Sequence, residues 1–561
     1  MSGVERKSSA DKADDATFIE RSVPVRLENA GEKNTVEWAQ LIQDAIAAER
    51  QEREQGWRQA FKDYPQSIFW SFAISLCIIM EGYDTALLGS ITGLPIFRQK
   101  YGKYSGNAAD GYQLEPAWQT AIGQASTVGN IIGIFVASWF QDRYGYRHTI
   151  QISLVLMAAF VFIVFFAPNV QVLFVGELLC GLPWGAFSSS AVSYASEVTP
   201  VALRGYLTTY VNLCWVIGQF ISAGVLLGVQ NRPDKWSYKI PFAVQWASQN
   251  KHHNVWPIPL FILATLAPES PWLLVRAGKL EQAKKSVMRL SKRNGDTDPD
   301  KVIAMMVRTN QLELENQPGV SYFDCFRGSD LRRTEIACIG WAIQVLSGSS
   351  HAYTGTYFFE QAGLSTANAF KFNLGQYAIG FCGTVGSWFT MTYVGRRTVY
   401  LYGLSVLAVL LILIGGLAVP SAHGDSGAKW GQAALVLMWV FTYDFTVGPV
   451  AYCIVGEVSS TRLRVKTVGL ARITYNIVGI VAGILNTYMM NPLAWGWKGY
   501  AGFFWFVSCV LCWIWSYFRL PECKGRTYRE LDILFERHVS ARRFRRTEVD
   551  LQDSQLHEHG P

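Results

Sequence analysis

The 561-residue chain has few charged side chains. Only 17% of its residues are Asp, Glu, Lys or Arg, whereas a soluble domain usually has about 25%. Half of the chain is hydrophobic, the apolar residues occur in long blocks, and the charges lie between the blocks. Length alone would suggest three or four soluble domains. The charge distribution excludes that organisation and favours a protein with many membrane spans.

The chain also lacks an apolar leader. Its first 65 residues are polar, so no cleavable signal peptide is predicted, and the first hydrophobic segment must direct insertion. Residues 1–65 and 541–561 are predicted to be disordered or loosely helical.

Patterns of enzyme chemistry are missing as well. No nucleophile–base triad, phosphate loop or metal-ligand spacing occurs outside the apolar blocks. The pair Cys509 and Cys512 has C-x-x-C spacing but no second pair, and most cysteines lie in apolar segments, as expected of buried thiols. The sequence predicts no enzyme, cofactor, metal site or disulfide scaffold. The net charge of +7 comes from cations in loops and tails, which favours membrane topology over nucleic-acid binding.

Twelve apolar segments are long enough to cross a bilayer, which takes about 20 residues. They lie near 67–92, 117–140, 148–167, 171–194, 207–229, 240–267, 336–359, 372–393, 398–419, 432–456, 467–490 and 499–519. The predicted organisation is a tail (1–65), a six-helix bundle (66–268), a linker (269–335), a second six-helix bundle (336–520) and a second tail (521–561). Most Lys and Arg residues fall on the side of the tails and linker, which predicts that both termini are cytoplasmic.

Three motifs recur at nearly one offset. Ser196-Glu-Val-Thr-Pro-Val-Ala-Leu-Arg204 is echoed by Gly456-Glu-Val-Ser-Ser-Thr-Arg-Leu-Arg464, the Gly145 motif by Gly395-Arg-Arg397, and Pro268-Glu-Ser-Pro271 by Pro521-Glu-Cys-Lys524. Three echoes in order indicate two related halves. Transporters built from such repeats bind their substrate between the halves.

These loop motifs contain acids and arginines at helix ends, where inter-helix ion pairs can close one side of a transporter. Simple topological anchoring is the alternative for each arginine. The predicted gating residues are Asp142, Arg143, Arg147, Glu197, Arg204, Arg396, Arg397, Glu457 and Arg464.

The D-R-x-G-x-R, G-R-R, P-E-S-P and P-E-x-K-G-R motifs resemble those of the sugar porter family of the major facilitator superfamily. Longer strings, including Glu81-Gly-Tyr-Asp-Thr-Ala-Leu-Leu88 and Tyr443-Asp-Phe-Thr-Val-Gly-Pro449, are similar to those of fungal maltose permeases. The resemblance runs from about residue 65 to 545. It implies an all-α membrane protein with twelve transmembrane helices in two pseudo-symmetric six-helix bundles. It also implies α-glucoside:proton symport by alternating access.

Charged residues inside spans are costly, at about 2.5–3.5 kcal/mol or more each, and mark functional sites. Glu81 and Asp84 share one helix face, where two neighbouring carboxylates do not both ionise easily. The resemblance implies that Asp84 carries the proton, with Glu81 assisting, Arg472 as counter-charge and Glu177 as a further acid. Exposure of Glu81 and Asp84 at a helix end is the alternative. Asp444 is predicted to be a gating acid.

One departure concerns Asn130, at a position where maltose permeases usually have Glu. Because Asn does not take up a proton near neutral pH, this residue leaves facilitated diffusion open as an alternative.

A sugar site requires uncharged hydrogen-bonding groups and aromatic surfaces. Asn212 and Gln219, seven residues apart on one helix face, are predicted to bind the sugar. The resemblance to sugar porters implies the same role for Gln344, for Ser350, where that family often has Asn, and for Tyr452, where it commonly has Trp. Helix packing is the alternative for each. A second departure is the polar insert 247–254 in the sixth segment, which is either a genuine insertion or a gene-model error.

The predicted function is therefore uptake of a sugar, with protons, by a monomer in the plasma membrane. Two alternatives remain: a cargo that is a glycoside-like secondary metabolite, and a sugar sensor that does not transport.

Overall fold

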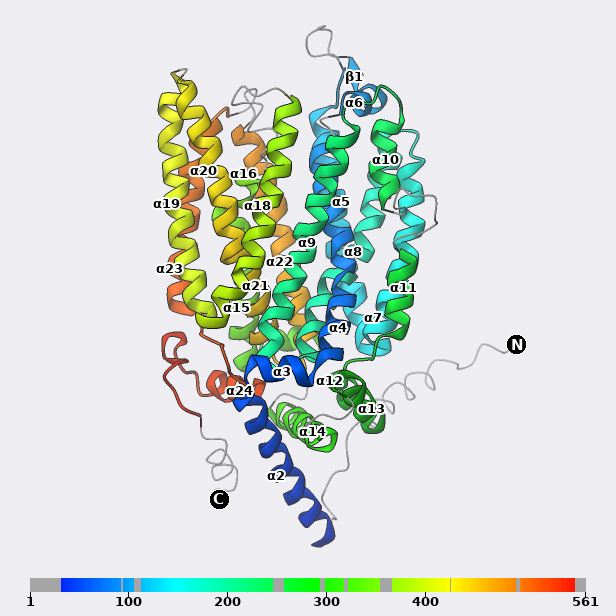
Figure 1. Cartoon of the computed structure of the whole chain (residues 1–561), viewed down its shortest axis with the longest axis vertical. Coiled ribbons are helices and arrows are strands. Elements are labelled where there is room, and N and C mark those ends of the chain that lie inside the picture. Colours follow the sequence, from blue (N-terminus) through cyan, green and yellow to red (C-terminus); the bar gives the residue numbers. More distant parts are fainter. Residues whose placement is uncertain are drawn as a thin grey trace, which may run out of the picture.

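The chain folds as a bundle of long helices that stand side by side (Figure 1). The computed structural model describes residues 32–91, 94–104, 112–245, 257–292, 298–316, 321–353, 366–423, 425–490 and 495–549. In these ranges the strands are limited to one antiparallel hairpin, in which β1 (Lys103–Tyr104) pairs with β2 (Tyr112–Gln113). The end of the bundle that carries this hairpin and α6 (Pro95–Tyr101) is called the hairpin face.

The first half of the bundle supplies six spans. They are formed by α4 (Pro65–Ser75) with α5 (Cys77–Ile91), the two parts of α7 (Pro116–Phe165), α8 (Val170–Val198), α9 (Val201–Val229), and α10 (Trp236–Val244) with α11 (Pro257–Leu266). The predicted insert 247–254 lies outside the described residues, between α10 and α11.

The second half repeats this plan. Its spans are α15 (Gly328–Gln344) continued by the π-helical turn η3 (Val345–Ser349) and α16 (Ser350–Ala352), then α18 (Thr366–Tyr393), α19 (Arg396–Ala422), α20 (Ser426–Phe445) with α21 (Val447–Val458), α22 (Arg464–Met490), and α23 (Ala501–Arg519) preceded by η4 (Lys498–Tyr500). This half begins at Gly328, earlier than the predicted position 336, because α15 extends beyond the apolar segment.

Apolar length supports most of these spans. Across the described residues, eight helices are long and apolar enough to cross a membrane, and a ninth apolar helix, α11, is shorter. One of the eight covers Thr120–Phe165, 46 residues, about twice the length that one span needs, and it breaks at Gly145. The broken seventh span, α18 and the α10–α11 pair complete the predicted twelve.

The two halves share a capping device that the repeated motifs encode. Gly145 adopts φ +88° and turns the chain between the second and third spans. The carboxylate of Glu269 then accepts hydrogen bonds from the backbone N–H of Tyr146 (3.0 Å) and Arg147 (3.2 Å). In the second half, Glu522 accepts from the N–H of Arg396 (2.8 Å) and Arg397 (3.2 Å). Each acid satisfies free N–H groups at a helix N-terminus, where negative charge is favoured.

Close backbone contact holds α7 against α8. A Cβ added at Gly129 or Gly133 of α7 would collide with the backbone of α8, and one at Gly181 or Gly185 would collide with α7. Glycines four residues apart allow helices in lipid to approach closely.

Two spans of the second half are discontinuous at the same depth. Gly348, at φ +104°, bends the seventh span within η3, and Thr446 (φ −127°, ψ −81°) separates α20 from α21. Interrupted helices expose backbone carbonyls inside transporter bundles, next to the substrate.

The end of the bundle opposite the hairpin is called the tail face (Figure 1). It carries α2 (Glu32–Glu54), α3 (Trp57–Asp63), α12 (Pro271–Arg276), α13 (Leu280–Leu290), α14 (Pro299–Asn316), η2 (Tyr322–Phe326), α24 (Tyr528–Glu536) and η5 (Ala541–Arg543). The N-terminal tail is helical over α2 and α3, as one form of the prediction had it, but it is not loose, because α2 packs on α14 and α9. The prediction of a disordered or loosely helical C-terminal tail is wrong for 541–549, where Phe544 and Val549 are buried. The polar sequence of these segments gave no indication of these contacts.

Candidate transport site and gates

A chain of four polar side chains crosses the interface between the halves. Glu81 of α5 forms an ion pair with Arg472 of α22. The Asn130 side chain of α7 donates to Oε1 of Glu81 (3.3 Å) and accepts from Asn476 of α22 (2.9 Å). All four are at least nine-tenths buried. Arg472 compensates the Glu81 charge, because a buried carboxylate without a cation is strongly disfavoured.

Asp84 lies in a different environment from Glu81, although the two share a helix. Its Oδ1 accepts from the Gln245 amide at the end of α10 (2.8 Å). Glu177 of α8 is close enough for its charge to interact with that of Asp84, and neither Glu177 oxygen has a hydrogen-bond partner within the described residues. Arg472, the predicted counter-charge of this acidic pair, binds Glu81. In the described part of the chain, Asp84 and Glu177 form no ion pair. The alternative that Glu81 and Asp84 are exposed at a helix end is wrong, since both are buried.

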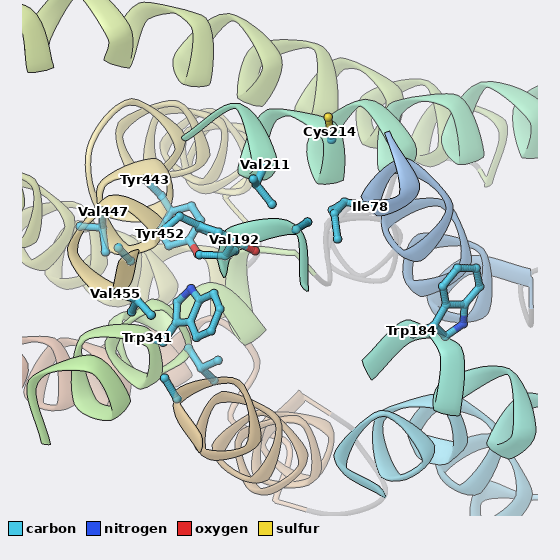
Figure 2. Packing of buried hydrophobic residues seen from close by; sticks show 14 of the residues in the cluster. Ile78, Trp184, Val192, Val211, Cys214, Trp341, Tyr443, Val447, Tyr452 and Val455 are labelled. Carbon is cyan, nitrogen blue, oxygen red and sulfur yellow. The ribbon is translucent and has the colours of Figure 1, made fainter. Parts of the chain in front are cut away.

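Gln344 joins the two interrupted spans. Its Nε2 donates to the carbonyl of Gly448 (3.3 Å), in the first turn of α21, and its Oε1 accepts from the Tyr443 hydroxyl (3.2 Å). The ring of Tyr452 meets Trp341 edge-on, with centroids 5.2 Å apart. Figure 2 shows these aromatic rings across from Val192 and Val211 of the first half. An amide beside aromatic rings at an inter-half surface is the arrangement that a sugar requires.

The other predicted sugar-binding residues differ in what their side chains contact. Asn212 and Gln219 of α9 are buried, and the Asn212 Nδ2 has no partner within the described residues. This unused donor is available to a hydroxyl group. Ser350 contributes its backbone carbonyl, which accepts from Asn486 (3.1 Å). Nothing in the described contacts brings the Ser350 hydroxyl to the cluster around Gln344.

A second, smaller contact between the halves is apolar. Ala86 of α5 and Ala223 of α9 pack against Tyr377 of α18, with Tyr353 beside them. Asp444 of α20 accepts a hydrogen bond from the Tyr353 hydroxyl (2.8 Å), and the Tyr353 ring stacks on Tyr377 at 6.1 Å. Asp444 therefore orients an aromatic residue that contacts both halves.

The tail face is closed by ion pairs between the halves. Glu197 at the end of α8 binds Arg276 of α12 (3.0 Å) and Arg464 at the start of α22 (3.6 Å). Asp142 of the first half pairs with Lys466 of the second. The Glu197–Arg464 pair is fully buried, and desolvated charge pairs are far less screened by salt than exposed ones.

Other predicted gating residues act differently. Arg396 binds Glu457 (3.1 Å) within the second half, although its guanidinium also lies against Gly205 of the first. Arg397 donates to the carbonyls of Tyr517 (2.7 Å) and Leu520 at the end of α23.

Three further arginines do not form the predicted ion pairs in the described part of the chain. Arg143 is exposed, Arg147 uses its backbone N–H, and Arg204 lies over the Tyr528 ring at 3.6 Å. The expectation of inter-helix ion pairs is wrong for these three and for Arg397, because aromatic rings and carbonyl groups attract guanidinium as well.

Tyr528 of the C-terminal tail joins the halves a second time. Its hydroxyl donates to the Ser196 carbonyl of α8 (2.9 Å), and its ring lies beside the guanidinium groups of Arg204 and Arg464. The neighbouring Thr527 donates to buried Glu49 of α2 (2.7 Å). In turn, Glu52 of α2 accepts from the N–H of Val201 at the start of α9 (2.9 Å). The N-terminal helix thus contacts both the first half and the C-terminal tail.

Sequence reasoning missed Asn476, Arg276, Tyr353 and Tyr528. Asn476 could have been found, since it stands one helical turn after Arg472 and faces the same way. The others gave no signal, because their partners lie far away in the sequence.

Comparison with known proteins identifies the family to which this chain belongs. The profile described as "Sugar (and other) transporter" matches residues 70–535. This chain belongs to the sugar transporter family. It is 40% identical to maltose permease MAL61 of Saccharomyces cerevisiae over 520 residues. This aligned region covers 91% of this chain and 82% of that protein. This chain is 37% identical over 554 residues to the general alpha-glucoside permease of the same species, covering 97% and 87%. The chain is a sugar transporter of the membrane, not an enzyme.

Solved structures support the same fold. The proton:xylose symporter XylE bound to 6-bromo-6-deoxy-D-glucose superposes on this transporter with a TM-score of 0.70 at 19% identity, covering 84% of this chain and all of that one. The inward-open conformation of XylE from E. coli gives 0.57 at 18% identity, covering 83% and 99%. The major facilitator fold predicted from the sequence is confirmed.

Proposed function

We propose that this transporter is an α-glucoside:proton symporter of the plasma membrane, with its tail face in the cytoplasm. Proteins named as maltose and alpha-glucoside permeases match more than nine-tenths of the chain, which supports the cargo. The arginine-rich tail face supports the orientation, because basic residues stay on the cytoplasmic side.

The pair Asp84 and Glu177 is the observation that carries the proton step. Both carboxylates are buried in the first half, they interact with each other, and in the described part of the chain neither has a cation. Two like charges in a low-dielectric site favour retention of one shared proton. Glu81 differs, since Arg472 keeps its charge compensated. Proton loading at Asp84 and Glu177 is therefore the proposed driving step.

The sugar is proposed to bind between the halves. Gln344, Asn212 and Gln219 would contact its hydroxyls, and the rings of Trp341 and Tyr452 would cover its apolar face. Both faces of the bundle have inter-half contacts, by ion pairs at the tail face and by the Ala86–Tyr377 contact toward the hairpin face. Alternating access then consists of breaking one set of contacts while the other holds.

The test uses liposomes that contain the purified transporter and a pH-sensitive dye. External maltose should acidify the lumen. One proton moving down a potential of 100 mV supplies about 2.3 kcal/mol, enough for roughly fifty-fold accumulation. Asp84→Asn and Glu177→Gln should abolish accumulation yet keep exchange of labelled maltose, which needs no net proton movement.

A matched control is Asp234→Asn, which removes an exposed carboxylate and should leave coupling intact. Maltose flux without any pH change would reject symport and favour facilitated diffusion. Binding of maltose without flux would indicate a sensor, and flux of another glycoside alone would reject the proposed cargo.

A further inference from the structure

The ordered end of the C-terminal tail forms a basic surface that transport does not use. Residues 537–549, called here the C-terminal strap, return from α24 toward the end of α23, and η5 packs against that helix. The guanidinium of Arg526 donates to the carbonyls of Phe544 (3.1 Å) and Thr547 (2.6 Å). Phe544 and Val549 are buried. The strap is thereby fixed to the bundle.

The strap concentrates positive charge. It exposes Arg537, Arg542, Arg543, Arg545 and Arg546 within ten positions, and among the described residues none of these five arginines has an acidic partner.

Glu548 within the strap and Glu536 directly before it are exposed, whereas two further acids beside the strap are engaged in ion pairs. Arg526 binds Glu530 (3.0 Å), and Arg333 binds Asp532 (2.6 Å). Burial, with repulsion from Arg396 and Arg545, lowers the pKa of Lys524. The surface consequently has a local excess of cations.

The strap also lies at the level where the bilayer ends. The Arg542 guanidinium sits over the rings of Tyr517 (5.8 Å) and Phe518 (5.6 Å), in the last turn of the α23 span. Phe518 is 56% exposed, as expected of a lipid-facing residue. Aromatic residues mark the boundary between hydrocarbon and headgroups. The strap arginines next to these rings are therefore at headgroup height.

We propose that the C-terminal strap binds the anionic phospholipid headgroups of the adjacent leaflet. Arg pairs with phosphate through two parallel hydrogen bonds, and a basic segment at the membrane surface gains from each cation near anionic lipid. Because the strap is held in place by Arg526 and Phe544, its cations lose little conformational freedom on binding. This binding is independent of the transported solute and its coupling.

The experiment compares lipid retention by two full-length variants. R543Q/R545Q/R546Q removes three exposed strap charges that form no ion pair with the described part of the protein. K279Q/K285Q/K292Q removes three exposed lysines around α13, elsewhere on the tail face. Each purified protein is placed in nanodiscs of phosphatidylcholine with a minor fraction of phosphatidylserine, and energy transfer from the protein tryptophans to dansyl-phosphatidylserine is recorded.

The strap variant should lose preference for phosphatidylserine by up to about fivefold per arginine removed, and the α13 variant should keep it. Added salt should weaken the preference of the parent. Both variants should still exchange labelled maltose, which shows that they fold. Equal loss in the two variants, or no loss in either, would overturn the proposal. Complete loss of the phosphatidylserine signal on addition of inorganic phosphate to the nanodiscs would also overturn the proposal, since the surface would then bind free anion rather than lipid.

Discussion

Removal of Arg472 is expected to destabilise the transporter more than removal of the whole polar pair. The Arg472–Glu81 contact joins α22 to α5 with both side chains 4% exposed. Arg472→Leu leaves Glu81 buried without a cation, with the Asn130 amide at 3.3 Å as its remaining side-chain partner among the described residues. Breaking a buried pair in this way costs about 3–5 kcal/mol, whereas replacing both partners by neutral groups is often nearly neutral. Glu81→Gln in the Arg472→Leu background should thus recover most of the loss.

The assay is a thermal-inactivation series of the parent, the two single variants and the double variant, read by size-exclusion elution after heating. A cost of 3–5 kcal/mol corresponds to about two to four orders of magnitude in the folding equilibrium, so the single Arg472 variant should aggregate at markedly lower temperature. The reasoning fails if Arg472→Leu is as stable as the parent, or if the double variant is less stable than Arg472→Leu alone. The matched control is Arg232→Leu, which breaks an exposed pair and should cost less than about 1 kcal/mol.

Three further predictions concern the gates and the tail. Burial raises the pKa of Glu49, so the charged form of this side chain opposes docking of α2. Docking should therefore weaken as the pH rises from the ordinary carboxyl pKa, about 4.3, through the raised pKa of docked Glu49. Glu49→Gln keeps the hydrogen-bond acceptor and should make protease protection of residues 32–54 independent of pH. Unchanged pH dependence in this variant would contradict the assigned cause. Glu49→Lys should expose the segment to protease. Gly145→Ala places an alanine at φ +88° against the capping carboxylate, and backbone strain alone should lower the stability by about 1–2 kcal/mol. The control Gly123→Ala, in the same helix, meets no neighbour and should be tolerated. Equal stability of the two variants would refute the assigned geometry. Tyr353→Phe keeps the ring but loses the bond to Asp444, and should lower maximal exchange of maltose more than maltose affinity, with a loss of affinity alone pointing to direct sugar contact instead.

Much of the fold was readable from composition and repetition. Apolar length gives a span wherever about 20 residues must bury their backbone in lipid, and the three repeated motifs located the halves. Hydropathy located the seventh and tenth spans but gave no sign of the breaks within them, since it continues unbroken through η3 and Thr446 while the backbone does not. Side chains of the facing helix stabilise these interrupted segments, as Gln344 does for the tenth span through the Gly448 carbonyl.

The charged residues of the transport site were found because charges in lipid are rare, yet their partners were not. Sequence spacing placed Glu81 and Asp84 on one face, which suggested that they act together. The structure pairs Glu81 with Arg472, whereas Asp84 accepts a hydrogen bond from Gln245 and interacts electrostatically with both Glu81 and Glu177. Which acid receives the cation depends on helix rotation of a few tens of degrees, and no local pattern encodes that rotation.

The sequence by itself determined that this protein lies in a membrane and that few ionisable groups lie within its spans, because transfer free energy along the chain dictates both. Its repeated motifs determined that it consists of two related halves. Tertiary structure alone decided the pairing across the halves, such as Glu197 with Arg464, Asn130 with Asn476, and Tyr528 between two arginines. These partners stand far apart in the sequence. Their contact depends on side-chain geometry at an interface that forms only once both halves have packed.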